Sequence, residues 1–70
     1  MTTKMKYKSE TIAKAVITTR YEIQPDRTAH WCDYGQGYEE KRVGATEKFT
    51  HYVLRFPDGV YEVESRRKAA

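Results

Sequence analysis

The chain has 70 residues, a net charge of +3, 33% charged residues and 13% aromatic residues. This length predicts a single domain over residues 1–70, and the single cysteine excludes an intrachain disulfide. No apolar run is long enough to span a membrane, and the basic N-terminus lacks the apolar stretch of a signal peptide, so we expect a cytoplasmic protein.

The N-terminal segment is basic and alternating. Lys4, Lys6 and Lys8 share one face of an extended chain, and Tyr7 lies on the other. Such lysines either protect an exposed sheet edge from aggregation or contact phosphate groups. We expect residues 1–8 to be a frayed terminus, with a short edge strand over residues 5–8 as the alternative.

Residues 9–33 combine helix and strand signals. Ser9 can cap a helix, but the run of β-branched residues at 16–19 loses side-chain freedom in one. We therefore expect at most one short helix over residues 9–15, followed by a strand. Pro25-Asp26 is a turn signal, and it predicts a first hairpin that joins residues 15–24 to residues 28–33.

The following segment, residues 34–47, holds three glycines and a run of charges, which indicates a long loop. We expect its adjacent glutamates, Glu39 and Glu40, to be solvated. Large side chains that dominate binding hot spots gather at the start of this loop. They are Trp31, Tyr34, Tyr38 and Arg42. We expect them to bind a protein partner, with a place in the core as the alternative for Trp31.

The strongest local signal is Pro57-Asp58-Gly59 between two runs of β-branched and aromatic residues, which predicts a hairpin over residues 48–64. Two registers are open. Turn chemistry favours Phe56 opposite Val60 with Gly59 in a bulge. Pairing Phe56 with Tyr61 instead gathers the apolar residues of both strands on one face. In either register we expect most buried side chains of this hairpin among Tyr52, Val53, Leu54, Phe56 and Val63.

These elements predict a mainly β fold, a small antiparallel sheet of two hairpins that can curl into a half-barrel, with at most one short N-terminal helix. Leu, Ile, Val and Phe make up only 11 of the 70 residues, so the core depends on tyrosine and tryptophan. Either the monomer is self-sufficient or a homodimer or another partner completes the core. The basic residues at 66–70 predict a second frayed terminus.

Metal-binding and nucleophilic residue types occur without the spacing that their chemistry needs. They are His30, Cys32, Asp33 and His51. A structural zinc site usually shows paired Cys-x2-Cys ligands, and a cysteine nucleophile needs a positioned base and a pocket. We expect a partly buried thiol beside surface histidines, and neither a metal, a cofactor nor an enzymatic activity.

We therefore expect a non-enzymatic protein-binding module that modulates a partner macromolecule. In its general character, as a small β domain with an aromatic loop, the chain resembles the accessory inhibitors of phages and mobile elements. The alternative is a nucleic-acid-binding domain in which Lys4, Lys6, Lys8 and Arg20 meet phosphates and aromatic rings stack on bases. The excess positive charge falls within residues 1–30, and residues 31–70 are neutral in sum, which favours a protein partner.

Overall fold

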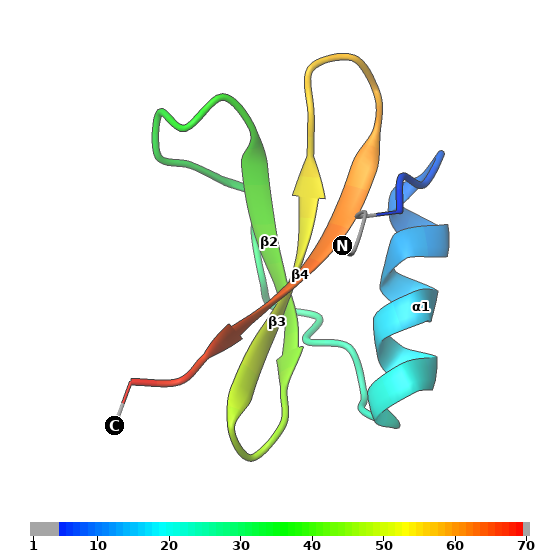
Figure 1. Ribbon diagram of the computed structural model, residues 1–70, viewed down its shortest axis with the longest axis vertical. Coiled ribbons are helices and arrows are strands. Elements are labelled where there is room, and N and C mark those ends of the chain that lie inside the picture. The colour runs from blue at the N-terminus through cyan, green and yellow to red at the C-terminus, as the bar shows by residue number, and fades with distance from the viewer. Residues whose placement is uncertain (1–4, 70) are drawn as a thin grey trace.

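The computed structural model describes residues 5–69 as one helix packed on one side of a four-stranded antiparallel sheet (Figure 1). The elements are α1 (Glu10–Tyr21), β1 (Cys32–Asp33), β2 (Glu39–Ala45), β3 (Phe49–Arg55) and β4 (Tyr61–Arg67). The strand order is β1-β2-β3-β4, so β1 and β4 form the two edges. The predicted mainly β class is confirmed, and the sheet stays open rather than closing into a barrel.

Helix α1 is longer than predicted, because it continues through the β-branched run. The Ser9 side chain caps its start by accepting the N–H of Ile12 at 3.2 Å. Ala13 and Ile17 are buried against the sheet, and the Thr18 hydroxyl donates to the carbonyl of Ala15 at 3.3 Å. Burial of one helical face thus outweighs the poor helix propensity of these residues.

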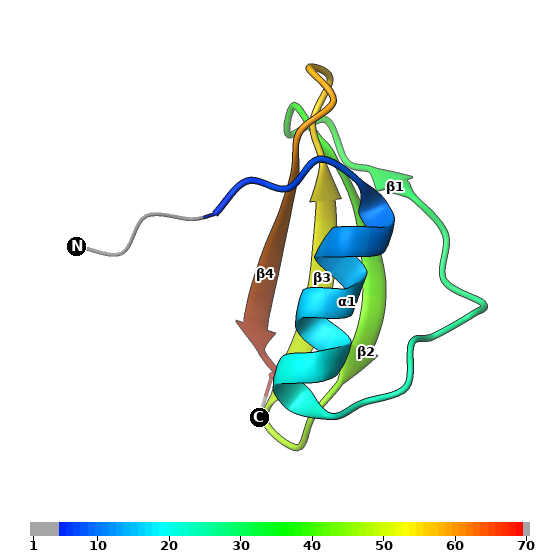
Figure 2. The same cartoon turned by 90° about the vertical axis from the view of Figure 1, so that its right-hand side faces the viewer.

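The predicted first hairpin is therefore wrong, and Pro25-Asp26 lies in the connection between α1 and β1 (Figure 2). The helix ends where Glu22 takes a left-handed conformation with φ of 53°. Beyond it, the backbone N–H of Asp26 donates to the carbonyl of Val43 at 2.6 Å, which attaches the connection to β2.

The predicted second hairpin is confirmed, together with the register favoured by turn chemistry. The Phe56 N–H donates to the carbonyl of Val60 at 2.9 Å, and the Gly59 N–H donates to the carbonyl of Phe56 at 3.0 Å. Gly59 has a φ of 88°, the conformation that a bulge of this type needs. Further along, Val53 pairs with Val63.

The predicted loop over residues 34–47 is wrong from Glu39 to Ala45, because this segment forms β2. A bulge interrupts its pairing with β3 between Arg42 and Gly44. A Cβ atom on Gly44 would lie 3.0 Å from Ile23 Cδ1 and 3.3 Å from the Gln24 carbonyl oxygen, so the α1–β1 connection packs directly on this glycine.

The core lies between α1 and the sheet, where Ala13, Ile17, Val43 and Val53 are buried together. His51 is also fully buried on this side, which contradicts its predicted place on the surface. Its Nδ1 lies 2.6 Å from Ser65 Oγ, its Nε2 lies 3.1 Å from the Thr46 hydroxyl, and its ring stacks on Tyr21 at 3.9 Å. Burial lowers the pKa of His51.

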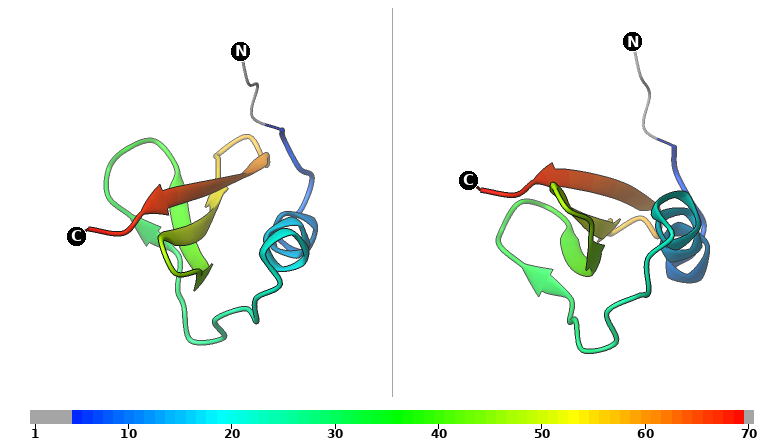
Figure 3. Two further views of the ribbon diagram at one scale, coloured as in Figure 1. Left: turned by 60° about the horizontal axis from the view of Figure 1, so that its bottom comes forward. Right: turned by 90° about the horizontal axis from the view of Figure 1, so that it is seen from below.

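The view from below shows α1 on a single side of the sheet (Figure 3), and we call the other side the open face. Successive side chains alternate between faces, so Tyr52 and Leu54 flank the core residue Val53 and point to the open face. Leu54 is only 2% exposed there, whereas Tyr52 is half-buried. No helix within residues 5–69 is long and apolar enough to cross a membrane.

Near the N-terminus, Tyr7 forms an isolated bridge with Tyr61 of β4. Within residues 5–69 this bridge is the only part of the predicted edge strand over residues 5–8 that forms. Arg66 and Arg67 belong to β4. Lys4, with the rest of residues 1–4, and Ala70 lie outside the described residues.

Candidate functional site

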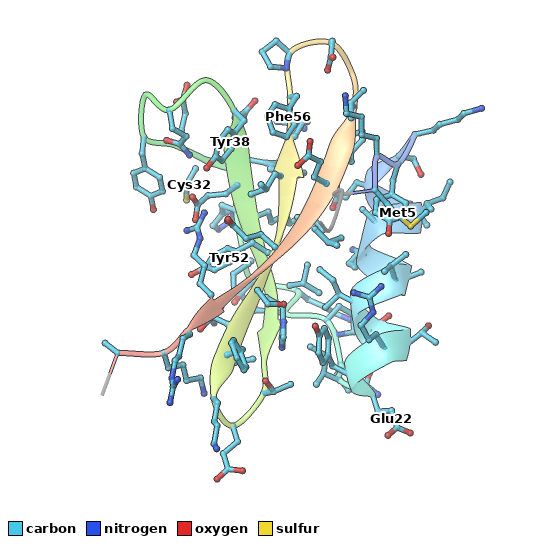
Figure 4. All side chains as sticks on the ribbon, viewed as in Figure 1. Met5, Glu22, Cys32, Tyr38, Tyr52 and Phe56 are labelled. Atoms are coloured by element: carbon cyan, nitrogen blue, oxygen red, sulfur yellow. The ribbon has the colours of Figure 1, made fainter. Side chains whose placement is uncertain are left out.

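A groove opens between the β1–β2 turn and the β3–β4 turn, with a volume of about 590 Å³. Tyr38 and Phe56 contribute its aromatic part, with ring centroids 5.0 Å apart (Figure 4). Glu39 pairs with Arg55, so Tyr38 and Phe56 continue the two strands side by side. The groove lies at the ends of these strands, and its lining also includes Arg55 and Tyr61, which pair with each other on the helix side of the sheet. We call this space the turn groove.

Local hydrogen bonds shape the β1–β2 turn. The Gly35 N–H donates to Asp33 Oδ1 at 2.8 Å, and the Tyr34 N–H donates to Gln36 Oε1 at 3.0 Å. Gly35 and Gly37 have φ angles of 80° and 96°, which non-glycine residues rarely adopt. This turn leaves the Tyr34 side chain 72% exposed.

A second groove of about 360 Å³ lies against the open face beside Tyr34. Its lining includes Cys32, Tyr34, Arg42 and Tyr52. Arg42 is held in place by Asp26, whose Oδ2 accepts from Arg42 Nη2 at 2.6 Å and from Nε at 3.2 Å. These bonds to Arg42 keep the pKa of Asp26 well below its usual value, and the nearby Cys32 side chain raises the pKa of Tyr34.

An ion-pair network on Arg66 occupies the middle of the open face. Its Nη1 and Nη2 donate to the two carboxylate oxygens of Glu40 at 2.8 Å and 3.0 Å, and Nη2 lies 2.6 Å from a Glu64 oxygen. The guanidinium also lies 4.4 Å from the ring centre of Tyr52. Glu40 is 8% exposed, so the prediction that it is solvated is wrong.

Three of the four predicted protein-binding residues line a groove. Tyr38 lines the turn groove, and Tyr34 and Arg42 line the groove beside Tyr34. Trp31 packs against the core on the helix side, where Arg55 and Lys41 lie 4.1 Å and 5.6 Å from its ring.

The sequence analysis did not assign Tyr52, Phe56 and Arg66 to the binding surface. The two-residue alternation of side chains along β3 could have indicated it, because it places Tyr52, Leu54 and Phe56 on one side. The neighbouring strand β2 had been predicted as a loop.

The described residues among the predicted phosphate-binding set lie on different elements. Lys6 and Lys8 are exposed in the segment before α1, and Arg20 is exposed in the last turn of α1, on the other layer of the molecule. Lys4 lies outside the described residues. Lys6, Lys8 and Arg20 line neither the turn groove nor the groove beside Tyr34.

The residues with metal-binding or nucleophilic chemistry are dispersed. Within residues 5–69 no group of three or more His, Cys, Asp or Glu side chains is arranged to hold a metal. The Cys32 thiol donates to the His30 carbonyl at 3.5 Å, whereas His51 lies in the core on the opposite side of the sheet. His51 does bond a serine hydroxyl, on Ser65, but its other nitrogen meets the Thr46 hydroxyl and not a carboxylate.

Comparisons of this chain with protein-family models, with curated proteins and with solved structures found no match in any of the three.

Proposed function

We propose that the chain is a non-enzymatic protein-binding module that modulates its partner by covering part of the partner's surface with the open face. The observation that supports this most is the Tyr38–Phe56 pair in a solvent-open groove, flanked by the exposed Tyr34. Aromatic side chains bury large areas at a small cost in conformational entropy, and for this reason they dominate binding hot spots.

The setting of these aromatic residues supports recognition by a preformed surface. They extend from a sheet whose pairing holds β2, β3 and β4 together. Leu54 is buried beneath the open face, so the surface around it is already densely packed. A rigid, concave site loses little entropy when a partner binds.

The charges of the open face favour a protein over a nucleic acid. Arg42 is paired with Asp26, and Arg66 is paired with Glu40 and Glu64. Paired cations offer little net attraction to a phosphate backbone. An apolar partner side chain would insert against Tyr38 and Phe56, and the polar rim of the groove, which includes Asp33, would meet the partner's backbone N–H groups.

The test is capture of binding partners from a nuclease-treated extract by the immobilised protein. We expect the double variant Tyr34→Ala, Tyr38→Ala to lose the captured protein while its thermal unfolding stays close to wild type, because both side chains lie at a turn. Met5→Ala is the matched control, since it removes a similarly exposed apolar side chain that is 67% exposed and lies near α1 (Figure 4). Equal capture by the double variant would contradict the proposal.

The nucleic-acid alternative makes a different prediction about salt. Binding through phosphates would weaken steeply between low and physiological salt and would fall when Lys6, Lys8 and Arg20 are replaced together. We expect weak oligonucleotide binding that the loss of Tyr34 leaves unchanged. Tight, salt-sensitive binding that survives the open-face variants would favour the alternative.

A further inference from the structure

The outer edge of β4 carries backbone groups that point away from β3. Tyr61 points its backbone groups outward, where they exchange hydrogen bonds of 2.7 Å and 2.9 Å with Tyr7. Backbone groups alternate in direction along a strand, so Val63, Ser65 and Arg67 also point theirs outward. Among residues 5–69 only Tyr7 pairs with this edge. An exposed edge of this kind is a template for a further strand.

We propose that a second copy of this chain binds here, with β4 antiparallel to β4 and Ser65 opposite the partner's Ser65. The proposal depends on the charge pattern of the strand itself. A symmetric dimer uses the same patch twice, so its interface must be complementary to itself. The end of β4 meets this condition in one register.

In the Ser65-centred register, Glu64 lies opposite the partner's Arg66, and Glu62 lies opposite the partner's Lys68. Symmetry repeats each pair, and opposite charges across strands are stabilising. Moving the centre to Glu64 would place two glutamates face to face, and moving it to Arg66 would do the same with two arginines. Like charges directly opposite one another destabilise a sheet, so the sequence selects the Ser65 register.

Helix α1 presents an apolar surface to the same side. Glu10 bonds Lys41 of β2 at 3.0 Å, which fixes the side of the helix that faces β2. At about 100° per residue, Ile12 and Val16 lie on the opposite side, toward β4. Ile12 is 49% exposed there. We call this surface the helix stripe. It consists of Ile12, Ala15, Val16, Thr19 and Arg20.

The proposed pairing would bring the two helix stripes toward each other. Residues paired across antiparallel strands point to the same face, so both helices lie on one side of the joined sheet. Ser65 is small and exposed, which leaves room on the helix side where the two copies meet. The open face stays uncovered in this dimer, so the inference is independent of the proposed function, and partner capture can succeed or fail without it.

The test is the association constant of the full chain, measured by sedimentation over a wide range of concentrations. Glu62→Lys and Lys68→Glu would each place like charges opposite one another twice, and we expect about tenfold weaker association for each. The double variant Glu62→Lys, Lys68→Glu should restore it. Glu47→Lys, in the β2–β3 turn, makes the same charge change away from the edge and should leave association unchanged.

A fifth variant, Ile12→Glu, tests the helix stripe, and circular dichroism checks that each variant is folded. The proposal is overturned if the protein is monomeric at every concentration. It is equally overturned if a dimer forms and the single charge variants associate as tightly as wild type, or if the double variant fails to restore association.

Discussion

Arg66 and Glu40 stand 26 positions apart in the chain, yet the guanidinium of Arg66 binds both carboxylate oxygens of Glu40 at 2.8 Å and 3.0 Å. This bidentate pair spans from β4 to β2 across β3. Such a pair is directional as well as strong, so it fixes how the three strands present the open face. It also neutralises a carboxylate that has little contact with water.

Arg66→Ala should lower the free energy of unfolding by about 1–3 kcal/mol, because it leaves the Glu40 carboxylate buried without its main partner. The lower half of this range is expected, since the Arg66 side chain is 39% exposed and water can take its place. In the double variant with Glu40→Gln, urea unfolding should show a loss smaller than the sum of the two single losses. Additive losses would mean that the pair contributes nothing.

His51 should make the stability fall as the pH falls below neutrality. Burial lowers its pKa in the native state, while the unfolded chain takes up a proton near pH about 6.5. Stability is therefore full above about pH 6.5 and is lost as the pH drops from there toward the lower native pKa. The difference between the urea midpoints of wild type and His51→Phe should change with pH in this window only. A difference that stays constant across the window would contradict the lowered pKa of His51.

The contribution of the Asp26 carboxylate to stability changes in a lower pH range than that of His51, so the two contributions can be measured separately. Its bonds to Arg42 and Thr28 lower its native pKa, so its contribution is present above the unfolded pKa of about 4 and is lost below it. A scan that stops at about pH 5 therefore isolates His51.

Replacing Glu22 with glycine should stabilise the protein by about 0.5–1 kcal/mol, because glycine adopts a left-handed helix end without the cost that a side chain incurs. Glu22 has a φ of 53° and is exposed at the end of α1 (Figure 4). Glu22→Ala is the control, since it removes the charge and keeps the Cβ atom. Differential scanning calorimetry should show a higher Tm for the glycine variant only. A higher Tm for both would point to the charge instead.

Leu54→Ala should cost about 2–5 kcal/mol, the usual range for a buried leucine, although no helix of the described chain covers this residue. Its packing comes from neighbours on the open face. In a small domain such a loss is a large part of the total stability. An unchanged denaturation midpoint would show that Leu54 is accessible in solution.

The second hairpin could be predicted because its turn is specified locally. Proline, aspartate and glycine at 57–59 set the turn by their own conformational preferences, whatever the rest of the chain does. The same reasoning failed at Pro25-Asp26, where aspartate bonds Thr28 and Arg42 instead of closing a hairpin. A turn signal shows that the chain bends, but not which elements it joins.

Helix α1 and strand β2 depend on contacts that are distant in sequence. Residues 16–19 have poor helix propensity and are helical because Ile17 is buried against the sheet. The charges of β2 suggested a loop, but Glu40 and Glu39 are each paired with an arginine from another strand. The open face draws side chains from four strands and two turns, so only part of it could be found from the sequence.

The most direct test of the proposed function is site-specific photo-cross-linking in a nuclease-treated extract of cells that contain the partner. Benzoylphenylalanine is placed at Tyr34, on the open face, and at Glu47, in the β2–β3 turn, as a control in the same protein. The account predicts a product with one protein from the Tyr34 position and none from the Glu47 position, and Tyr38→Ala should abolish it. A protein product of equal yield from both positions, or a product from the Glu47 position alone, would contradict the claim that the open face binds the partner.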